Sequence, residues 1–242
     1  MSARWMRWFA NRQTANFMGV ARLEEGHRIF DGVFTPSEMQ ELLGRLSTAD
    51  LERTKAGARH LLRMTVVRKL AGDVRMLELA RGFLGPSAVP FKATLFDKSP
   101  AANWLVVWHQ DTALPVQRRT ESDEWGPWST KAGLLYAHAP AWALEQVIAL
   151  RVSLDGSFAE NGPLRVLPNT HRGGVLTDAE IERLAREVAP VDCVAPSGSV
   201  IAMRPLTVHA SSKATSEQPR RILHIEYATA VDLGAGIELA VV

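Results

Sequence analysis

Apolar positions recur at helical spacing in the first third of the chain. Thr35-Pro36-Ser37-Glu38 places a capping Thr before a Pro and a Glu three residues later, which is a typical helix start. Apolar residues follow at intervals of three and four from Met39 to Leu46. A second helix is predicted over 73–84, ending at Gly85, and a third after Thr177. We expect these amphipathic helices to pack on a sheet.

From about residue 91 the pattern changes to short β-rich runs separated by Gly, Pro, Asn and Asp. Many short strands without a regular alternation of strands and helices indicate a mainly β, antiparallel sandwich or jelly roll with flanking helices. The predicted strands cover 91–96, 104–108, 133–136, 147–154, 164–167, 199–203 and 222–228.

The chain carries no internal repeat, low-complexity tract or long linker, so we expect residues 1–242 to form one domain. Its helical scaffold is expected mostly within 30–90 and its jelly-roll core within about 91–230. The segment 112–131 is polar, contains Trp125 and Trp128, and lacks periodicity. Loops of this length are usually functional or mobile, and we expect this one to be such a loop.

Composition narrows the classes of protein further. The chain has 242 residues, a 46% hydrophobic fraction and a formal charge of +2, which gives no argument for a nucleic-acid partner. No apolar run approaches the roughly 18 residues that a membrane span needs. The single cysteine, Cys193, rules out an internal disulfide, and residues 1–10 lack the apolar core of a secretory signal. We therefore expect a cytoplasmic protein, whose oligomeric state the sequence does not specify.

The sequence His109-Gln110-Asp111 follows directly on a predicted strand. Residues i and i+2 of an extended chain point the same way, so His109 and Asp111 can face a single point. Iron(II) oxygenases bind their metal with two imidazoles and one carboxylate and leave the other positions open. Such a pair is weak evidence alone, because a second histidine must come from elsewhere.

His209 follows the predicted strand 199–203 and is the candidate for that second histidine. Arg220 comes eleven residues later and opens the last predicted strand. A hairpin between them would bring a guanidinium back towards the metal, where it could bind the far carboxylate of a chelating dicarboxylate. We favour Arg220 for this role over its neighbour Arg221, since Arg220, Ile222, His224 and Glu226 form an unusually polar strand face.

In these motifs the sequence resembles the phytanoyl-CoA dioxygenase family of Fe(II)- and 2-oxoglutarate-dependent oxygenases. The resemblance runs from about residue 30 to 228 and is strongest at 95–100, 108–111, 160–172 and 220–227. It implies a double-stranded β-helix, a cupin-like jelly-roll barrel. It also implies Fe(II), 2-oxoglutarate and O₂ as cofactors and co-substrates, with His109, Asp111 and His209 as iron ligands and Arg220 as the 2-oxoglutarate anchor. Asp111 argues against the halogenating relatives, which lack this carboxylate.

Other residues are candidates for the rest of the pocket. The resemblance places Arg151 near the co-substrate, and Lys98 is a weaker candidate for the same pocket. Trp125 and Trp128 would either close over the substrate or anchor a packed loop, and His138 would line the substrate pocket or lie at the surface. A structural hydrogen bond is expected for His171, a surface position for His27 and His60, and a buried, unreactive thiol for Cys193.

The expected function is a dioxygenase that hydroxylates a C–H bond of a small or medium organic molecule, with secondary metabolism as the setting that the resemblance suggests. The same oxidant can also desaturate, cyclise or epimerise, and the sequence does not name the substrate. Two alternatives remain, a jelly-roll metalloenzyme that does not use 2-oxoglutarate and a non-catalytic ligand-binding jelly roll. The first would be indifferent to Arg220→Ala, and the second would keep its ligand affinity without His109 and Asp111.

Overall fold

The computed structural model describes residues 23–54, 57–100 and 102–242, so the N-terminal segment 1–10 considered above lies outside the described residues. Its largest element is a seven-stranded sheet with all neighbours antiparallel. In spatial order the strands are β1 (His27–Phe30), β14 (Val200–Met203), β9 (Val147–Ser153), β16 (Arg220–Ala228), β4 (Val89–Lys98), β3 (Gly57–Ala58) and β2 (Arg53–Thr54).

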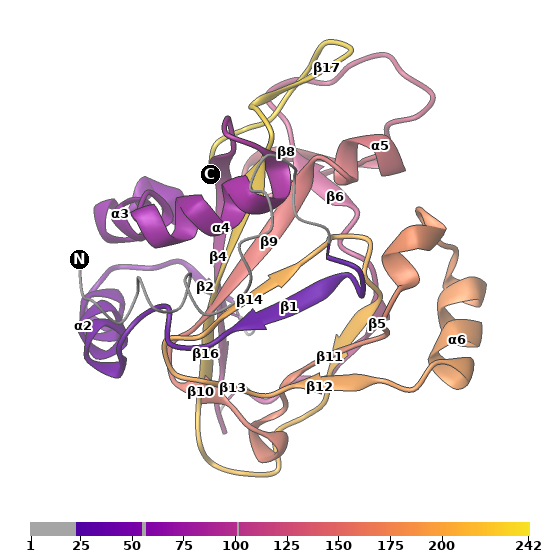
Figure 1. The fold of residues 1–242 in the computed structure, drawn as a ribbon. Helices are drawn as coiled ribbons and strands as arrows, with labels where there is room; N and C mark the ends of the chain where they lie inside the picture. The colour runs from indigo at the N-terminus through magenta and orange to yellow at the C-terminus, as the bar shows by residue number, and fades with distance from the viewer. Residues whose placement is uncertain (1–22, 55–56, 101) are drawn as a thin grey trace, which may run out of the picture.

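A four-stranded antiparallel sheet lies opposite the large sheet and closes the barrel (Figure 1). Its order is β12 (Val191–Cys193), β11 (Leu164–Val166), β15 (His209–Ser211) and β5 (Val106–His109). Side chains of β11, β12 and β14, with Ala195, form one buried apolar cluster between the sheets, comprising Leu164, Val166, Cys193, Ala195, Ile201 and Met203. This arrangement is the predicted jelly roll, and Cys193 is buried as expected.

A smaller three-stranded sheet is formed by β6 (Ala113–Pro115), β8 (Leu134–His138) and β7 (Trp128–Lys131). Two of its strands fall within 112–131, which corrects the prediction of an irregular loop there. Two-stranded pairs β10 (Gly156–Ser157) with β13 (Ala195–Pro196) and β17 (Asp232–Gly234) with β18 (Ile237–Glu238) complete the strands. The bridge between Val116 and Leu239 ties the segment after β6 to the C-terminal region.

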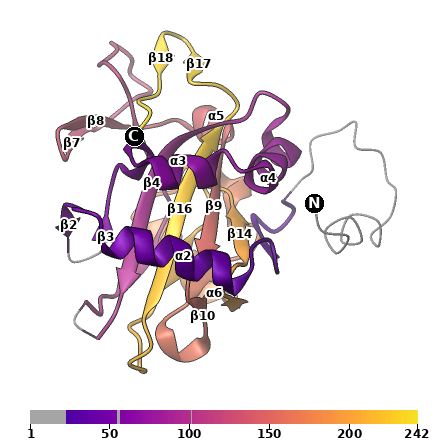
Figure 2. The same ribbon diagram turned by 90° about the vertical axis from the view of Figure 1, so that its left-hand side faces the viewer.

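Helices α2 (Pro36–Ser47), α3 (Thr65–Ala71) and α4 (Val74–Leu84) cover the outer face of the large sheet (Figure 2). The remaining helices are α5 (Ala141–Leu144) and α6 (Asp178–Glu187), with 3-10 turns η1 (Leu61–Arg63), η2 (Ala159–Asn161) and η3 (Thr170–Gly173). The capping boxes predicted at Thr35 and Thr177 are both present. None of the helices in the described ranges is both long and apolar enough to cross a bilayer.

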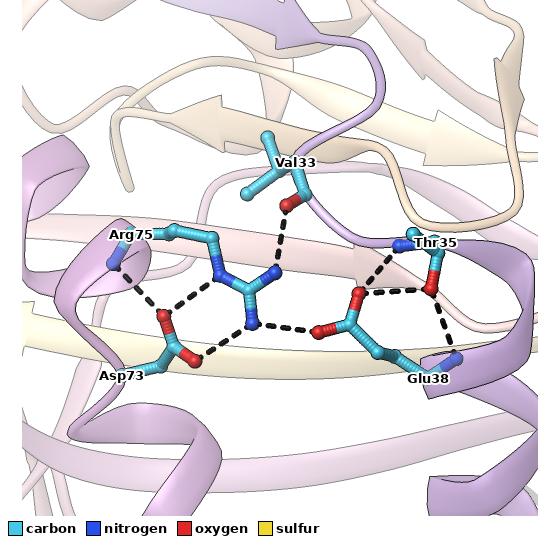
Figure 3. Close-up of polar contacts among 5 residues, drawn as sticks. All are labelled: Val33, Thr35, Glu38, Asp73 and Arg75. Carbon is cyan, nitrogen blue, oxygen red and sulfur yellow. Dashed lines mark hydrogen bonds and ion pairs between the residues drawn. The ribbon is translucent and has the colours of Figure 1, made fainter. Parts of the chain in front are cut away.

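A polar network joins the starts of α2 and α4 (Figure 3). Arg75 donates to Asp73 at its own helix start and to Glu38, the third residue of the α2 capping box. Its guanidinium also donates to the Val33 carbonyl and lies 4.1 Å from the Phe34 ring centroid. These contacts fix how the helical layer sits on the sheet, and they lie on the side away from the barrel interior.

The two faces of the large sheet differ sharply in chemistry. Alternate residues of β16 point outward and join the apolar core under the helices, among them Leu223, Ile225 and Tyr227. The intervening residues of the same strand include Arg220, His224 and Glu226, which are buried and polar. Because strand residues alternate between faces, one face supports the fold and the other lines the barrel with charge.

Candidate metal centre

The strands β5 and β15 pair directly and place the two candidate histidines opposite each other. His109 is the register partner of His209, and their ring centroids are 4.2 Å apart. Asp111 lies just past the end of β5, and its backbone N–H donates to the Pro205 carbonyl at 3.0 Å. The long-range pairing that the sequence left open therefore brings these three side chains together.

Gln110, between the two candidate ligands of the early motif, points the other way. Its amide nitrogen donates to the carbonyls of Leu206 and Gly174, and its oxygen accepts from the Leu176 N–H. Every bond of this side chain goes to backbone, so it ties the motif both to Leu206, in the segment that precedes His209, and to the turn before α6. These bonds hold His109 and Asp111 on one face, as the alternation of an extended chain requires.

Backbone carbonyls fix the orientation of both imidazoles. The Nδ1 atom of His109 lies 2.8 Å from the Val107 carbonyl oxygen, and that of His209 lies 2.9 Å from the Thr207 oxygen. A carbonyl only accepts, so each Nδ1 carries the proton and donates. Each Nε2 is therefore left as a free lone pair, which is the arrangement that metal-binding histidines use.

The donor atoms fit one metal ion. The Nε2 atoms of His109 and His209 lie 3.7 Å and 3.5 Å from the two Asp111 carboxylate oxygens. Bonds of ~2.0–2.2 Å put neighbouring ligands of one ion about 3 Å apart, so little movement is needed. The side chains of His109 and Asp111 are 36% and 38% exposed, whereas that of His209 is 5% exposed, so the cluster stays open on one side.

Electrostatics keep these groups in the forms that a metal requires. Burial lowers the pKa of His209 to about 4, so its imidazole is neutral at neutral pH. Burial alone would raise the pKa of Asp111, but the neighbouring His209 and His109 outweigh it and hold the pKa well below its usual range. The centre thus offers two imidazoles and one carboxylate, the set that non-haem Fe(II) oxygenases use.

A group of buried cations lies next to this centre, contacting the other end of β15. The Nη2 atom of Arg220 and the Nζ atom of Lys98 lie 3.1 Å and 2.9 Å from the same hydroxyl, that of Ser211, two residues after His209. Lys98 also donates to the Ser212 carbonyl, and Arg220 Nε to the Asn161 carbonyl. Arg220 is 4% exposed and Lys98 is 1% exposed.

No carboxylate neutralises this pair. Within the described ranges, neither Arg220 nor Lys98 forms an ion pair, and residues 1–22, 55–56 and 101 contain no Asp or Glu in the sequence. Burial, and then Arg220, lowers the pKa of Lys98 to about 8, and burial followed by Arg151 lowers that of Arg220. Buried charges require partners, so this cluster is built for an anion that the chain itself does not supply.

Arg151 begins a second set of polar groups in the barrel, which contains one carboxylate, that of Glu226. The Nη1 atom of Arg151 lies 2.9 Å from His224 Nδ1. A guanidinium only donates, so Nδ1 is the acceptor and His224 carries its proton on Nε2. That Nε2–H donates to Glu226 at 2.9 Å, and Lys92 donates to the same carboxylate oxygen at 2.8 Å. The contacts with Arg151 on one ring nitrogen and with Glu226 on the other fix the orientation of His224.

The family model for phytanoyl-CoA dioxygenase matches residues 23–222 of this chain. The chain belongs to the phytanoyl-CoA dioxygenase family. The resemblance noted from the sequence is thereby confirmed.

Relatives of this family member include L-proline trans-4-hydroxylase of Streptomyces griseoviridis, 24% identical over 163 residues. That match covers 57% of this chain and 52% of the relative, so the chain spans about half the length of that curated protein. Among solved structures, EctD from S. alaskensis with 2-oxoglutarate and 5-hydroxyectoine is 19% identical, with a TM-score of 0.66 over 91% of this chain and 80% of that one.

The epimerase SnoN in complex with Fe³⁺, α-ketoglutarate and nogalamycin RO is likewise 19% identical. Its TM-score is 0.63, and the match covers 90% of this chain and 91% of that chain. At these identities the likeness establishes a shared fold. The double-stranded β-helix expected for the family is therefore the fold of this chain.

The candidate substrate residues of this family member lie in two different settings. Trp125 is buried and packs edge-to-face on Trp142 with ring centroids 6.1 Å apart. Trp128 packs against the same apolar cluster, which we call the hairpin cluster and which includes Phe91, Leu114, Val116, Trp125, Ala137 and Leu144. These positions favour the packed anchor over the lid. His138 is exposed, and its Nδ1 lies 2.7 Å from the hydroxyl of Thr112, the residue after Asp111.

Three further histidines, His27, His60 and His171, lie outside the candidate metal centre. His60 is buried and lies 2.9 Å from the Tyr136 hydroxyl, so its predicted surface position is wrong. His27 is half-buried, since β1 pairs with β14. The Nδ1 of His171 is buried and has no hydrogen-bond partner among the described residues, so the expected hydrogen bond is not seen at that atom.

The neighbouring arginines of β16 separate as favoured from the sequence. Arg220 is buried on the barrel side, whereas Arg221 lies on the other face and forms two side-chain hydrogen bonds with Asp155. Sequence reasoning missed Ser211, which contacts both buried cations, and Tyr136, which contacts His60 and Lys92. Only the polar alternation of β16 and of β4, where Lys92 and Lys98 alternate with apolar residues, gave a usable signal.

Proposed function

We propose that this protein is a non-haem Fe(II)- and 2-oxoglutarate-dependent dioxygenase. It hydroxylates a C–H bond of a small or medium organic molecule. His109, Asp111 and His209 bind the iron, Arg220 binds the distal carboxylate of 2-oxoglutarate, and Lys98 and Arg151 complete the co-substrate pocket. The observation that carries the proposal is the joining of a metal-binding triad to an acid-free pair of buried cations through β15, His209 at one end and Ser211 at the other.

The bound iron, with 2-oxoglutarate and O₂, supplies the oxidising chemistry, which yields succinate, CO₂ and a hydroxylated substrate. The protein contributes the geometry. The two Nδ1–H groups fix the tautomer and the orientation of the imidazoles, and Gln110 fixes the spacing of His109 and Asp111. The Arg220 guanidinium can bind a carboxylate with two parallel hydrogen bonds, which orients the dicarboxylate along the barrel.

The close packing around the cation pair also suits a fixed binding site. Gly162 has a φ of +68°, and a Cβ there would meet the Ser212 carbonyl oxygen at 2.4 Å and Lys98 Nζ at 3.1 Å. Only glycine allows this approach of the backbone to Lys98. The pocket floor is therefore held by backbone, which limits the motion of the ammonium group.

The proposal is tested by adding Fe(II) and 2-oxoglutarate anaerobically and recording the weak visible charge-transfer band of the chelate. Asp111→Ala should abolish the band, and Asp50→Ala, at an exposed position, should leave it unchanged. After O₂ is admitted, the wild type and Asp50→Ala should both form succinate, and Asp111→Ala should form none. A wild-type protein that binds Fe(II) but forms neither the band nor succinate contradicts the proposal and supports a jelly-roll metalloenzyme that does not use 2-oxoglutarate.

A further inference from the structure

The hairpin of β7 and β8 carries Lys131 on the same face as Tyr136. The strands are joined by Ala132 and Gly133, whose φ angles of 47° and 77° suit a tight two-residue turn. In the register of the hairpin, Lys131 pairs with Leu134 and Ser129 pairs with Tyr136. Lys131 and Tyr136 therefore share one face, and the Lys131 ammonium lies 5.0 Å from the Tyr136 ring centroid.

The opposite face of the hairpin is occupied by its own core. Trp128 and Ala137 are register partners and belong to, or pack against, the hairpin cluster. The face with Lys131 cannot turn into that core without breaking this packing. Lys131 therefore lies on the hairpin face that carries Tyr136, whose ring Lys92 of β4 also contacts.

A second cation reaches the same place from another part of the chain. Tyr136 accepts or donates a hydrogen bond at 2.9 Å with His60, which is buried and has a left-handed φ of 59°. Such a backbone is unfavourable for a non-glycine residue and persists only where the surroundings hold it. Arg59, next to His60, is exposed, and its charge contributes to lowering the pKa of both His60 and Lys131.

The charges around Tyr136 do not balance. Lys92 lies 5.8 Å from the Tyr136 ring centroid, and its charge is neutralised by Glu226 at 2.8 Å. The side chains of Lys131 and Arg59 form no hydrogen bond or ion pair within the described ranges. Glu52 is near enough to His60 to raise its pKa, but Arg59, Lys92 and Arg63 act more strongly and in the opposite direction, so positive charge is in excess around Tyr136.

This cation pair lies near the candidate metal centre. Burial is the largest cause of the lowered pKa of Lys131, followed by Arg59 and Lys92, while Asp111 acts in the opposite direction. The strand register places the two together, since β6 begins two residues after Asp111 and pairs with β8, with Pro115 opposite Tyr136. Arg220 and Lys98 lie at the other end of β16 from Glu226, so the two pairs of cations are separate sites.

We infer that Lys131 and Arg59 bind an oxyanion of the substrate, a carboxylate or a phosphate ester, and so hold an organic acid against the metal centre. This inference rests on the proposed function, because it names the substrate class of the same barrel. An ammonium and a guanidinium with free donors are the groups that recognise such anions. The Tyr136 ring supports the ammonium from below, and the left-handed backbone at His60 positions the guanidinium.

The test uses the full chain, loaded anaerobically with Fe(II) and 2-oxoglutarate, and follows the shift of the chelate band as each compound is added. The panel pairs anions with neutral partners: 3-phenylpropanoate and N-acetyl-L-leucine with their methyl esters, and sn-glycerol 3-phosphate with glycerol. At least one anion should bind at least about tenfold more tightly than its neutral partner, a difference of about 1.4 kcal/mol. The carboxylate and phosphate arms identify which oxyanion is preferred.

Lys131→Gln and Arg59→Gln should each weaken binding of that anion about tenfold and leave its neutral partner unchanged. Lys131→Arg should restore most of the affinity, and Lys69→Gln, an exposed lysine of α3, is the matched control. The dissociation constant of 2-oxoglutarate, read from formation of the band, should be the same in all variants.

Equal binding of anions and neutral partners, or binding of none of the anions, overturns the inference, as does retained discrimination in Lys131→Gln. A tenfold loss of 2-oxoglutarate affinity in Lys131→Gln also overturns it, since Lys131 would then belong to the co-substrate site. In each of these cases a normal chelate band and slow 2-oxoglutarate turnover without substrate keep the proposed function intact. Failure of the wild-type protein to form the band contradicts the proposed function itself.

Discussion

Buried cations lie along one face of β16 at both ends of the barrel, and the two ends differ in their acids. At one end Lys92 is paired with Glu226, which also accepts from His224. At the other end Arg220 and Lys98 donate only to a hydroxyl and to carbonyls. Similar burial thus serves two purposes: the chain balances its own charge where it needs stability and leaves the charge unbalanced where a ligand supplies the balance.

The largest expected effect is on stability, at the balanced end. Burial would lower the pKa of Lys92, but Glu226 and Asp111 outweigh it and raise that pKa, so Lys92 is charged at neutral pH. Glu226→Gln leaves this ammonium buried without its acid and should lower the free energy of unfolding by about 3–5 kcal/mol. Urea unfolding with an unchanged m-value measures the loss.

Two variants control for this effect. Glu187→Gln removes an exposed ion pair with Arg183 and should cost at most about 1 kcal/mol. Adding Lys92→Met to Glu226→Gln removes the orphaned charge and should recover part of the stability. A loss below about 1 kcal/mol in Glu226→Gln itself would erase the difference between the two ends.

At the end with Arg220 and Lys98, we expect a substitution to reduce co-substrate affinity and not stability. Arg220→Met removes a buried charge that has no acid, so the free energy of unfolding should stay the same or rise by about 1 kcal/mol. The dissociation constant of 2-oxoglutarate should rise by at least about 100-fold, since each of the two hydrogen bonds to the carboxylate contributes ~1.5–3 kcal/mol. Band titration and urea unfolding of one preparation give both values, and a stability loss of several kcal/mol with unchanged affinity would contradict the assignment.

Lys98 adds a pH dependence to the same end. Burial, and then Arg220, lowers its pKa to about 8, so its ammonium form dominates below this pH and is lost above it. Only the charged form attracts the dicarboxylate. The dissociation constant of 2-oxoglutarate should therefore rise by up to about tenfold between pH 7 and pH 9.

The control for this pH dependence is Lys98→Met, in which the rise should be much smaller. Its affinity at pH 7 should already resemble that of the wild type at high pH. Wild-type and variant profiles with the same slope would assign the titration to another group.

The difference between the ends was visible in the sequence only in part. The alternation of Arg220, His224 and Glu226 with apolar neighbours predicted a polar barrel face, because strand periodicity is a local property. The capping boxes at Thr35 and Thr177 are local in the same way, and both helices form as predicted. Metal ligation by the His109–Asp111 pair was predicted from spacing together with the family resemblance.

Features that depend on distant pairing could not be read in this way. Strands β6 and β7 replace a predicted loop, because they are short and their apolar residues face a cluster assembled from several segments, whereas their partner β8 was predicted as a strand. His60 and Lys131 meet at Tyr136 from positions far apart in the chain, so neither carries a local signal. The polar contacts that join Arg220 and Lys98 through Ser211 are likewise set by tertiary structure.

The smallest expected effect concerns the register of β16. Arg221 is next to Arg220 in the sequence but forms a two-pronged ion pair with Asp155, with side chains 30% and 16% exposed. Arg221→Met should cost about 1 kcal/mol of stability, since partly exposed pairs are screened by solvent, and it should leave 2-oxoglutarate affinity unchanged. The same titration and unfolding experiments measure both. A loss of co-substrate affinity in Arg221→Met comparable to that in Arg220→Met would indicate that the register of β16 is shifted by one residue. The other face of β16 would then line the barrel, which is incompatible with the packing of Leu223, Ile225 and Tyr227 beneath the helices.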